Sequence, residues 1–305
     1  MPPSPPLNYD SPPALRAFLD GRGLGMRKRL GQNFLINPDA RRQLLDALDV
    51  PPEERVWEIG SGLGAMTSSL LDRGLAVTAF EIDKGFIPAL REFFGGNPAF
   101  TLVEGDVLKT WRTAPPGDYL LGNLPYTIGA ALLAGFIENN RFFKRMVVTV
   151  QKEVARRMAA RACSKDYSSF SVLCASAYTV TPLLIMKGAS FYPEPRVDSQ
   201  GVRLDLRTDR DPAGYPVFFR PLLRCLFASR RKTVKNNLES FASSLAGATL
   251  NRGDLSGICA SALRDTGIAP NERAERLGVD DFAALAGALE RALGQAGDGN
   301  AYGGC

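Results

Sequence analysis

The sequence predicts an α/β fold in which helices cover a parallel sheet, followed by a small all-helical domain. Up to about residue 210, short apolar runs read as strands, and polar residues or glycines follow them. Beyond residue 211 the strand pattern stops, and apolar residues recur at helical spacing. The chain has 305 residues, 45% of them hydrophobic, which is enough for one large core and a smaller second domain.

The first strand that bears on function is predicted at residues 55–59. It runs into the turn Gly60-Ser61-Gly62-Leu63-Gly64, and a helical pattern follows at 68–73. Glycines at this spacing allow a tight turn, a close approach of the backbone to a ligand, and close packing of the helix on the strand. The turn therefore predicts a site for a nucleoside cofactor.

Two further strands end in acidic residues. The run 76–80 leads to Glu81, and the run 100–103 leads to Gly105-Asp106. An acidic residue about 20 positions after such a glycine turn commonly binds ribose hydroxyls. Because parallel strands end at the same edge of the sheet, these acids are expected beside the glycine turn.

Two cofactors are compatible with such a glycine turn, NAD and S-adenosylmethionine. The turn reads Gly-x-Gly-x-Gly, whereas dinucleotide sites have Gly-x-Gly-x-x-Gly. Glu58 stands two residues before the first glycine, where a carboxylate would repel a pyrophosphate and suit an ammonium group. These features favour S-adenosylmethionine.

The fourth strand, at 119–121, leads to Asn123-Leu124-Pro125-Tyr126. Pro125 ends strand pairing because it has no N–H. The Asn123 side-chain oxygen and a rigid backbone carbonyl offer two acceptors, and the Tyr126 ring offers a flat surface for a base. Such a turn could grip the exocyclic amine of an adenine, although a plain strand-ending turn has the same residues.

Taken in order, these segments resemble the class I S-adenosylmethionine-dependent rRNA adenine N6,N6-dimethyltransferases, and most closely the small-subunit (16S) rRNA enzymes. The resemblance covers roughly residues 27–288. It rests on 30–35, 58–64, Glu81, 105–106, 123–126 and the Pro-rich segment 191–199.

This resemblance implies a Rossmann-like class I methyltransferase sheet and transfer of two methyl groups to N6 of two adjacent adenosines. The cofactor contacts that it implies are Asn33, Leu35, Gly60, Glu81, Asp106 and Asn123. The catalytic residues that it implies are Asn123, Leu124, Pro125, Tyr126 and Phe191. Tyr126 and Phe191 would flank an adenine flipped out of its stack, whereas Phe191 taken without its Pro-rich neighbours is more typical of a core aromatic.

Four segments are expected along the chain. Residues 1–26 are predicted to be a disordered Pro-rich tail and 27–210 the catalytic domain. Residues 211–293 are predicted to be a helical RNA-binding domain and 294–305 a flexible tail. The strings 227–233 and 270–277 resemble the small-subunit enzymes more than the large-subunit methylases of macrolide resistance.

Basic residues suggest where RNA binds. The net charge is +5, and clusters of cations can follow a phosphate backbone. The candidates are Arg27, Lys28, Arg29, Arg230, Arg231, Lys232 and Lys235. Each cluster is also compatible with an ordinary solvated helix face.

Composition excludes several other classes of function. The chain has no histidine, which excludes Ser-His-Asp and Cys-His catalysis. Its five cysteines lack metal-ligand spacing, so no metal is expected. No apolar run is long enough for a membrane helix, and no signal peptide is recognisable. We therefore expect a cytoplasmic protein. The resemblance implies that it acts on small-subunit rRNA within a pre-ribosomal 30S particle, and we expect it to be a monomer.

Three alternatives remain open at this point. A large-subunit rRNA adenine methylase would share the catalytic segments. A non-catalytic RNA-binding accessory protein could keep the same fold without methylation. A small-molecule amine methyltransferase would share the glycine turn but would not need basic clusters on a helical domain.

Overall fold

The computed structural model describes residues 7–26, 32–246 and 252–299. The chain divides into two compact units. The first contains residues up to 156 together with 178–206, and the second contains 157–177 and the chain from 207 onward. The predicted boundary at residue 210 was therefore close, but the assignment of 157–177 to the catalytic domain was wrong. These residues belong to the helical unit because their apolar side chains, such as Tyr167 and Val172, lie in its core.

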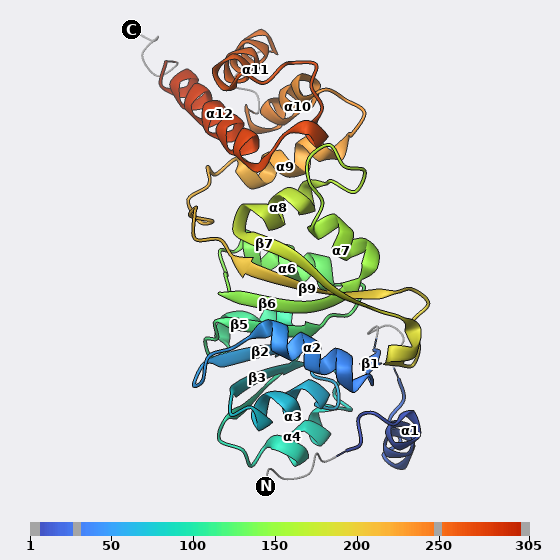
Figure 1. Ribbon diagram of the computed structural model, residues 1–305. Helices are drawn as coiled ribbons and strands as arrows, with labels where there is room; N and C mark the ends of the chain where they lie inside the picture. Colours follow the sequence, from blue (N-terminus) through green and yellow to red (C-terminus); the bar gives the residue numbers. More distant parts are fainter. Residues whose placement is uncertain (1–6, 27–31, 247–251, 300–305) are drawn as a thin grey trace. The chain divides into compact units, whose positions relative to one another are not determined.

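The first unit is built on a mixed sheet (Figure 1). Among the described residues, seven strands form this sheet in the order β4-β3-β2-β5-β6-β9-β7. Their bounds are β2 Arg55–Ile59, β3 Ala76–Glu81, β4 Phe100–Glu104, β5 Tyr119–Asn123, β6 Arg145–Gln151, β7 Tyr178–Met186 and β9 Ser199–Leu206. The five strands β4, β3, β2, β5 and β6 are parallel to one another, whereas β9 is antiparallel to both of its neighbours, β6 and β7. The strand order reverses between β2 and β5, where ligand crevices form in such sheets.

Helices alternate with the strands of this sheet along the chain. They are α2 Pro38–Leu48, α3 Ala65–Asp72, α4 Ile87–Phe94, α5 Val107–Thr110, α6 Gly129–Glu138 and α7 Lys152–Met158. Asn37 caps α2 by accepting a hydrogen bond from the Ala40 N–H at 2.9 Å, and Pro38 suits the first turn. Leu44 and Leu48 of α2 are at most 1% exposed and pack in the same cluster as Leu121 of β5.

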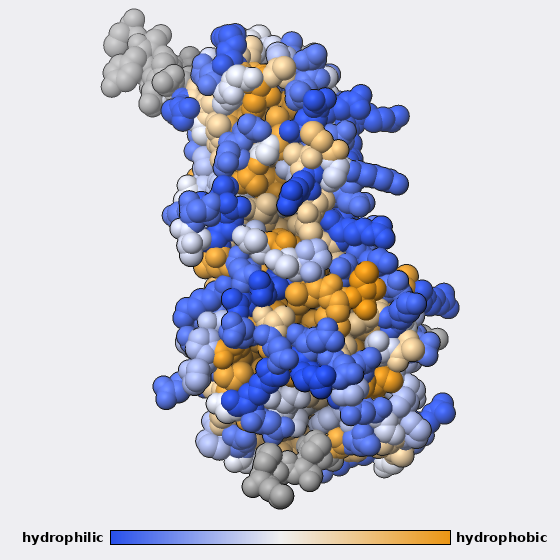
Figure 2. Space-filling model, viewed as in Figure 1, coloured by the Kyte–Doolittle hydropathy of each residue, from blue (hydrophilic) through white to orange (hydrophobic). Residues whose placement is uncertain are grey.

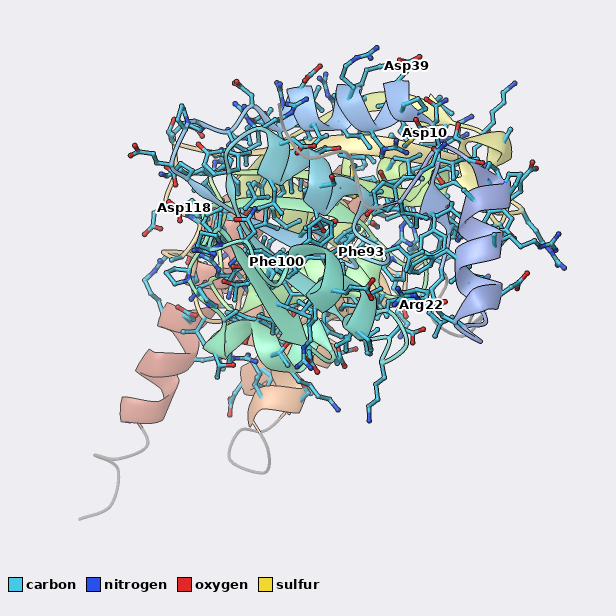
Figure 3. The ribbon with its side chains drawn as sticks, turned by 90° about the horizontal axis from the view of Figure 1, so that it is seen from below. Asp10, Arg22, Asp39, Phe93, Phe100 and Asp118 are labelled. Carbon is cyan, nitrogen blue, oxygen red and sulfur yellow. The ribbon has the colours of Figure 1, made fainter. Side chains whose placement is uncertain are left out.

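Residues 7–26 are not a disordered tail as predicted, because they contain helix α1, Pro12–Gly21. Ser11 caps this helix, and its hydroxyl accepts from the Ala14 N–H at 3.3 Å. Leu15 and Leu19 are 1% and 4% exposed, in a cluster with Leu63 and Phe86. Figure 3 shows α1 at the side of the sheet, with the labelled Asp10 near one end and Arg22 near the other. The prolines that precede this helix favoured the prediction of a disordered tail, so the apolar stripe of α1 was not recognised in the sequence.

The second unit has a purely helical fold within its described residues. Its helices are α8 Ser169–Ala177, α9 Phe219–Ala228, α10 Val234–Ala246, α11 Arg252–Thr266 and α12 Val279–Gly299. Fully buried side chains including Phe219, Leu238 and Phe282 form its core. The predicted flexible tail from residue 294 was wrong at its start, since α12 continues to Gly299.

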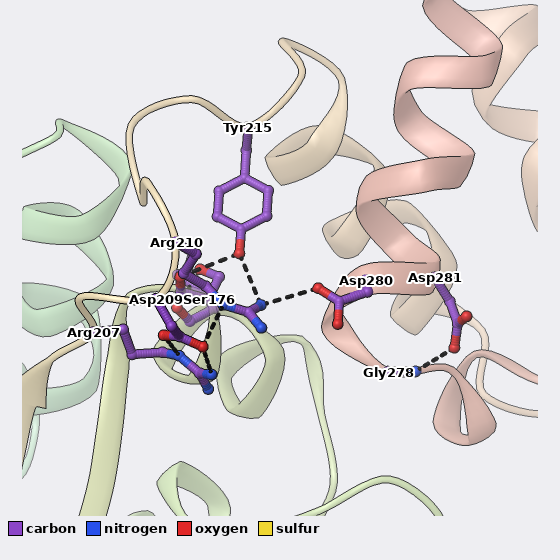
Figure 4. Close-up of polar contacts among 9 residues, drawn as sticks. Ser176, Arg207, Asp209, Arg210, Tyr215, Gly278, Asp280 and Asp281 are labelled. Carbon is purple, nitrogen blue, oxygen red and sulfur yellow. Dashed lines mark hydrogen bonds and ion pairs between the residues drawn. The ribbon is translucent and has the colours of Figure 1, made fainter.

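Polar contacts join the linker before α9 to the rest of this unit (Figure 4). Arg210 donates to the Tyr215 hydroxyl at 3.2 Å and to Asp280 of α12 at 3.1 Å. The Tyr215 hydroxyl donates to the Ser176 carbonyl of α8 at 3.2 Å. These contacts between distant parts of the chain explain why α8 belongs to the helical unit.

The edge strand β7 carries exposed apolar side chains. Figure 2 shows apolar surface gathered over the β7 and β9 side of the sheet, and Ile185 is 51% exposed. The pairing of β7 with β9 is interrupted between Pro182 and Ile185. An irregular edge with a proline pairs poorly with a strand from another molecule.

Candidate active site

A cavity opens at the carboxyl ends of β2, β3 and β5, where the strand order reverses. It encloses about 880 Å³ of space, a volume that includes its opening to solvent. Six of the predicted site residues line it: Asn33, Leu35, Gly60, Glu81, Asn123 and Pro125. The glycine turn and the Asn123 turn thus share one cavity, as the sequence predicted.

The glycine turn requires glycine at more than one position. Gly60, Gly62 and Gly64 have φ values of 74°, 58° and 89°, which residues other than glycine rarely adopt. A Cβ at Gly64 would also lie 2.3 Å from the Phe94 ring. Helix α3 can therefore start close against α4, and the turn presents its backbone to the cavity.

Glu81 holds this turn in place from the end of β3. Its carboxylate accepts hydrogen bonds from the backbone N–H groups of Gly62 and Asp83, both at 2.7 Å. The side chain is 5% exposed, and this burial raises the pKa of Glu81 to about 7. A carboxylate that fixes the turn and also lines the cavity can accept from ligand hydroxyls.

Glu58 of β2 is a second buried acid at the cavity. It is 3% exposed and accepts a hydrogen bond from the Thr67 hydroxyl at 2.5 Å. Burial, with a smaller contribution from the charge of Glu81, raises the pKa of Glu58 to about 8. A cationic ligand group beside it would favour its ionised form.

The turn after β5 is fixed by the backbone on both sides. The Asn123 side-chain N–H donates to the Asn33 carbonyl at 2.7 Å, which leaves its side-chain oxygen as an acceptor. The Leu124 N–H donates to the Thr149 carbonyl at 3.1 Å. The Pro125 carbonyl accepts from the N–H groups of Ile128 and Gly129 at the start of α6, so it is already paired within the turn.

A short strand pair brings the segments 30–35 and 191–199 together. β1, Phe34–Leu35, pairs antiparallel with β8, Phe191–Tyr192. Phe191 is 1% exposed and belongs to the core cluster that includes Leu35. It therefore does not present a ring face to a base in this structure, because its pairing with β1 turns it into the core.

Tyr126 is held by the same part of the chain. Its hydroxyl forms a hydrogen bond with Ser199 at the start of β9. Burial raises the pKa of Tyr126 above its usual value. Tyr126, Leu124, Phe191 and Asp106 are not among the residues that line the cavity.

Asp106 has a local structural role in this structure. Its carboxylate accepts from the Leu108 N–H at 3.0 Å and caps α5.

The sequence did not indicate the cavity residues Tyr9, Leu15 and Arg41. No motif marks these positions, because α1 and α2 bring them to the cavity only through packing.

The predicted RNA-binding residues fall into two groups. Arg27, Lys28 and Arg29 lie outside the described residues. Arg231 and Lys232 are exposed between α9 and α10. Arg230 is an ion-pair partner of Glu275 at 3.1 Å, and Lys235 lies 3.9 Å from Glu239. Arg231 and Lys232 are therefore the stronger candidates for contact with phosphate.

The described part of the chain offers no group of three or more acidic, cysteine or histidine residues that could hold a metal ion. In the same residues, no helix is both long and apolar enough to span a membrane.

Comparisons with known proteins show the family of this chain. The family described as ribosomal RNA adenine dimethylase matches residues 23–253. The ribosomal RNA small subunit methyltransferase A of Treponema pallidum subsp. pallidum is 41% identical over 290 residues, which cover 94% of this chain and 99% of that protein. The protein of the same name from Treponema denticola is 42% identical over 291 residues, which cover 92% and 95%.

A solved structure gives the same result. The crystal structure of a dimethyladenosine transferase from Plasmodium falciparum superposes with a TM-score of 0.69 and 26% sequence identity, and covers 84% of this chain and 97% of that one. The expected Rossmann-like class I methyltransferase fold is thereby confirmed. With a family match over most of its length and relatives above 40% identity along nearly the whole chain, this protein belongs to the ribosomal RNA adenine dimethylase family.

Proposed function

We propose that this protein transfers methyl groups from S-adenosylmethionine to N6 of adenines in small-subunit rRNA, giving dimethyladenosine. The observation that carries the proposal is the single cavity shared by the glycine turn, Glu81 and Asn123. A cofactor held at the first two would have its reactive end near the third.

The lining of the cavity fits S-adenosylmethionine. The glycine turn allows close approach of a ligand, and Glu81 can accept from ribose hydroxyls. Glu58 is a buried carboxylate suited to an ammonium group. When bound, S-adenosylmethionine supplies a methyl group on a positively charged sulfur that leaves as a neutral thioether.

Asn123 and Leu124 would position the target amine. An adenine amine is a weak nucleophile because its lone pair is delocalised into the ring. Acceptance of its two N–H groups by the Asn123 side-chain oxygen and the Leu124 carbonyl would favour a pyramidal nitrogen and stabilise the positive charge that develops on it. The hydrogen bond from Asn123 to Asn33 at 2.7 Å keeps that oxygen in place before the substrate arrives.

Tyr126 would present its ring to the flipped-out adenine, with its hydroxyl anchored on Ser199. Phe191 would need to leave the core to contact the base, so we assign the stacking role to Tyr126. Asp106 would contact the adenine of the cofactor only if α5, which it caps, lies at the rim of the occupied cavity.

The choice of small-subunit rRNA is supported by relatives of that name at 41% and 42% identity. The exposed Arg231 and Lys232 of the helical unit would bind phosphate groups of this RNA. We further propose that the protein acts as a monomer on a pre-ribosomal 30S particle.

The test is incubation of the protein with labelled S-adenosylmethionine and small ribosomal subunits from cells that lack the enzyme. Mass analysis of the nucleosides should show labelled dimethyladenosine. The Asn123→Ala variant should bind cofactor but lose most of the transfer. Asn139→Ala is the matched control, because Asn139 is exposed at the end of α6. Label found only in large-subunit RNA would overturn the assignment of substrate, and full activity of Asn123→Ala would overturn its role.

A further inference from the structure

The segment around the start of α1 forms part of the cofactor cavity. Tyr9 and Leu15 line the cavity and are 7% and 1% exposed. The Tyr9 hydroxyl donates to the Leu63 carbonyl within the glycine turn at 2.9 Å. Residues 7–21 therefore close one wall of the cavity.

The same segment fixes a buried cation at this wall. Arg41 of α2 lines the cavity and is only 8% exposed. Its guanidinium donates to the Leu35 carbonyl at 2.7 Å and to the carboxylate of Asp10. In Figure 3 the labelled Asp10 lies between α1 and α2, so the docking of α1 and the position of Arg41 depend on each other.

A buried anion lines the same cavity. Glu58 and Arg41 both line it, and Tyr9 interacts electrostatically with both of them. Among the ion pairs of the described residues, none joins Glu58 to Arg41. A ligand group that carries a positive and a negative charge would fit two such separated side chains, because each charge would meet its opposite.

We propose that Arg41 binds the carboxylate of the amino-acid end of the cofactor, and that Tyr9 and Asp10 position it for this task. The inference rests on the proposed cofactor, S-adenosylmethionine. A guanidinium has five N–H donors, and the contacts of Arg41 to Leu35 and Asp10 use two of them. Donors therefore remain for a carboxylate, which arginine binds well.

The assay compares two ligands that share the thioadenosine part. S-adenosylhomocysteine has the amino-acid end, and 5′-methylthioadenosine lacks it. Calorimetry on the full chain should show that Arg41→Met weakens S-adenosylhomocysteine about 10- to 100-fold. The affinity for 5′-methylthioadenosine should change by about twofold or less, since that ligand has no carboxylate to lose.

The matched control is Arg42→Met, the next residue on α2. Arg42 is exposed and pairs with Asp39, so both affinities should stay at the wild-type value. Asp10→Asn and Tyr9→Phe should weaken S-adenosylhomocysteine less than Arg41→Met does, with the same ligand selectivity. If Arg41→Met does not fold, Asp10→Asn carries the test.

Three results would overturn the inference. Equal losses for the two ligands would mean that Arg41 only shapes the wall of the cavity. Unchanged affinities would mean that Arg41 does not contact the ligand. If the wild-type protein binds neither ligand, the proposed cofactor itself fails, and this result is distinct from the other two.

Discussion

Replacement of Glu81 by alanine tests whether one carboxylate both holds the glycine turn and binds the cofactor. The change removes the acceptor of two backbone N–H groups, from Gly62 and Asp83, each at 2.7 Å. An unpaired buried amide costs about 1–3 kcal/mol. The free energy of unfolding should therefore fall by about 2–6 kcal/mol, toward the low end if water enters the space.

The same variant should bind the cofactor more weakly. A hydrogen bond to a charged group is worth about 1.5–3 kcal/mol, or roughly a 10- to 150-fold change in Kd. The measurements are urea unfolding and calorimetry with S-adenosylhomocysteine at pH 8, because the pKa of Glu81 is raised to about 7 and the group is mainly ionised there.

A neighbouring acid supplies the control for this experiment. Glu104 is the register partner of Glu81 on β4, but its side chain is 41% exposed, so Glu104→Ala should leave the affinity unchanged. Reduced stability of Glu81→Ala with unchanged affinity would refute the ribose assignment and leave Glu81 with a structural role only.

Three further predictions concern charge and packing. Burial raises the pKa of Glu58 from 4.5 to about 8, so its stabilisation is present at low pH and is lost as the pH rises through 8. Glu58→Gln should flatten the fall of Tm between pH 5 and 9, and an unaltered slope would contradict the assignment. Replacing Arg231 and Lys232 by alanine should make RNA binding less sensitive to salt. The magnitude of the negative slope of the logarithm of the RNA association constant against the logarithm of the salt concentration should fall by about 1.4–1.8, and an identical slope would show that neither residue contacts phosphate. Leu15→Ala should speed amide exchange in α1, whereas wild-type protection would mean that other contacts hold this helix.

Features that depend on near neighbours in the chain could be predicted from the amino-acid sequence. An apolar run followed by glycines predicts a strand and a tight turn wherever it occurs, because the backbone conformation at Gly60, Gly62 and Gly64 is local. The positions of Glu81 and Asn123 at strand ends followed in the same way. Since parallel strands end at one edge of a sheet, the sequence alone was enough to place these residues in one cavity.

The other residues that reach this cavity could not be predicted, because they are brought there by packing between distant segments. Tyr9 contacts Leu63 across 54 positions of the chain, and Arg41 contacts Asp10 across 31. No local pattern marks such pairs, because their proximity arises when α1 docks through the buried Leu15 and Leu19.

Packing between distant segments also explains why the motif at 191–199 was recognised in the sequence while the burial of Phe191 was not predicted. The burial of Phe191 depends on the pairing of β8 with β1. Likewise, residues 157–177 belong to the helical unit because their side chains pack in its core. Local sequence sets the conformation of a segment, whereas contacts between segments far apart in the chain set the burial and the neighbours of each side chain.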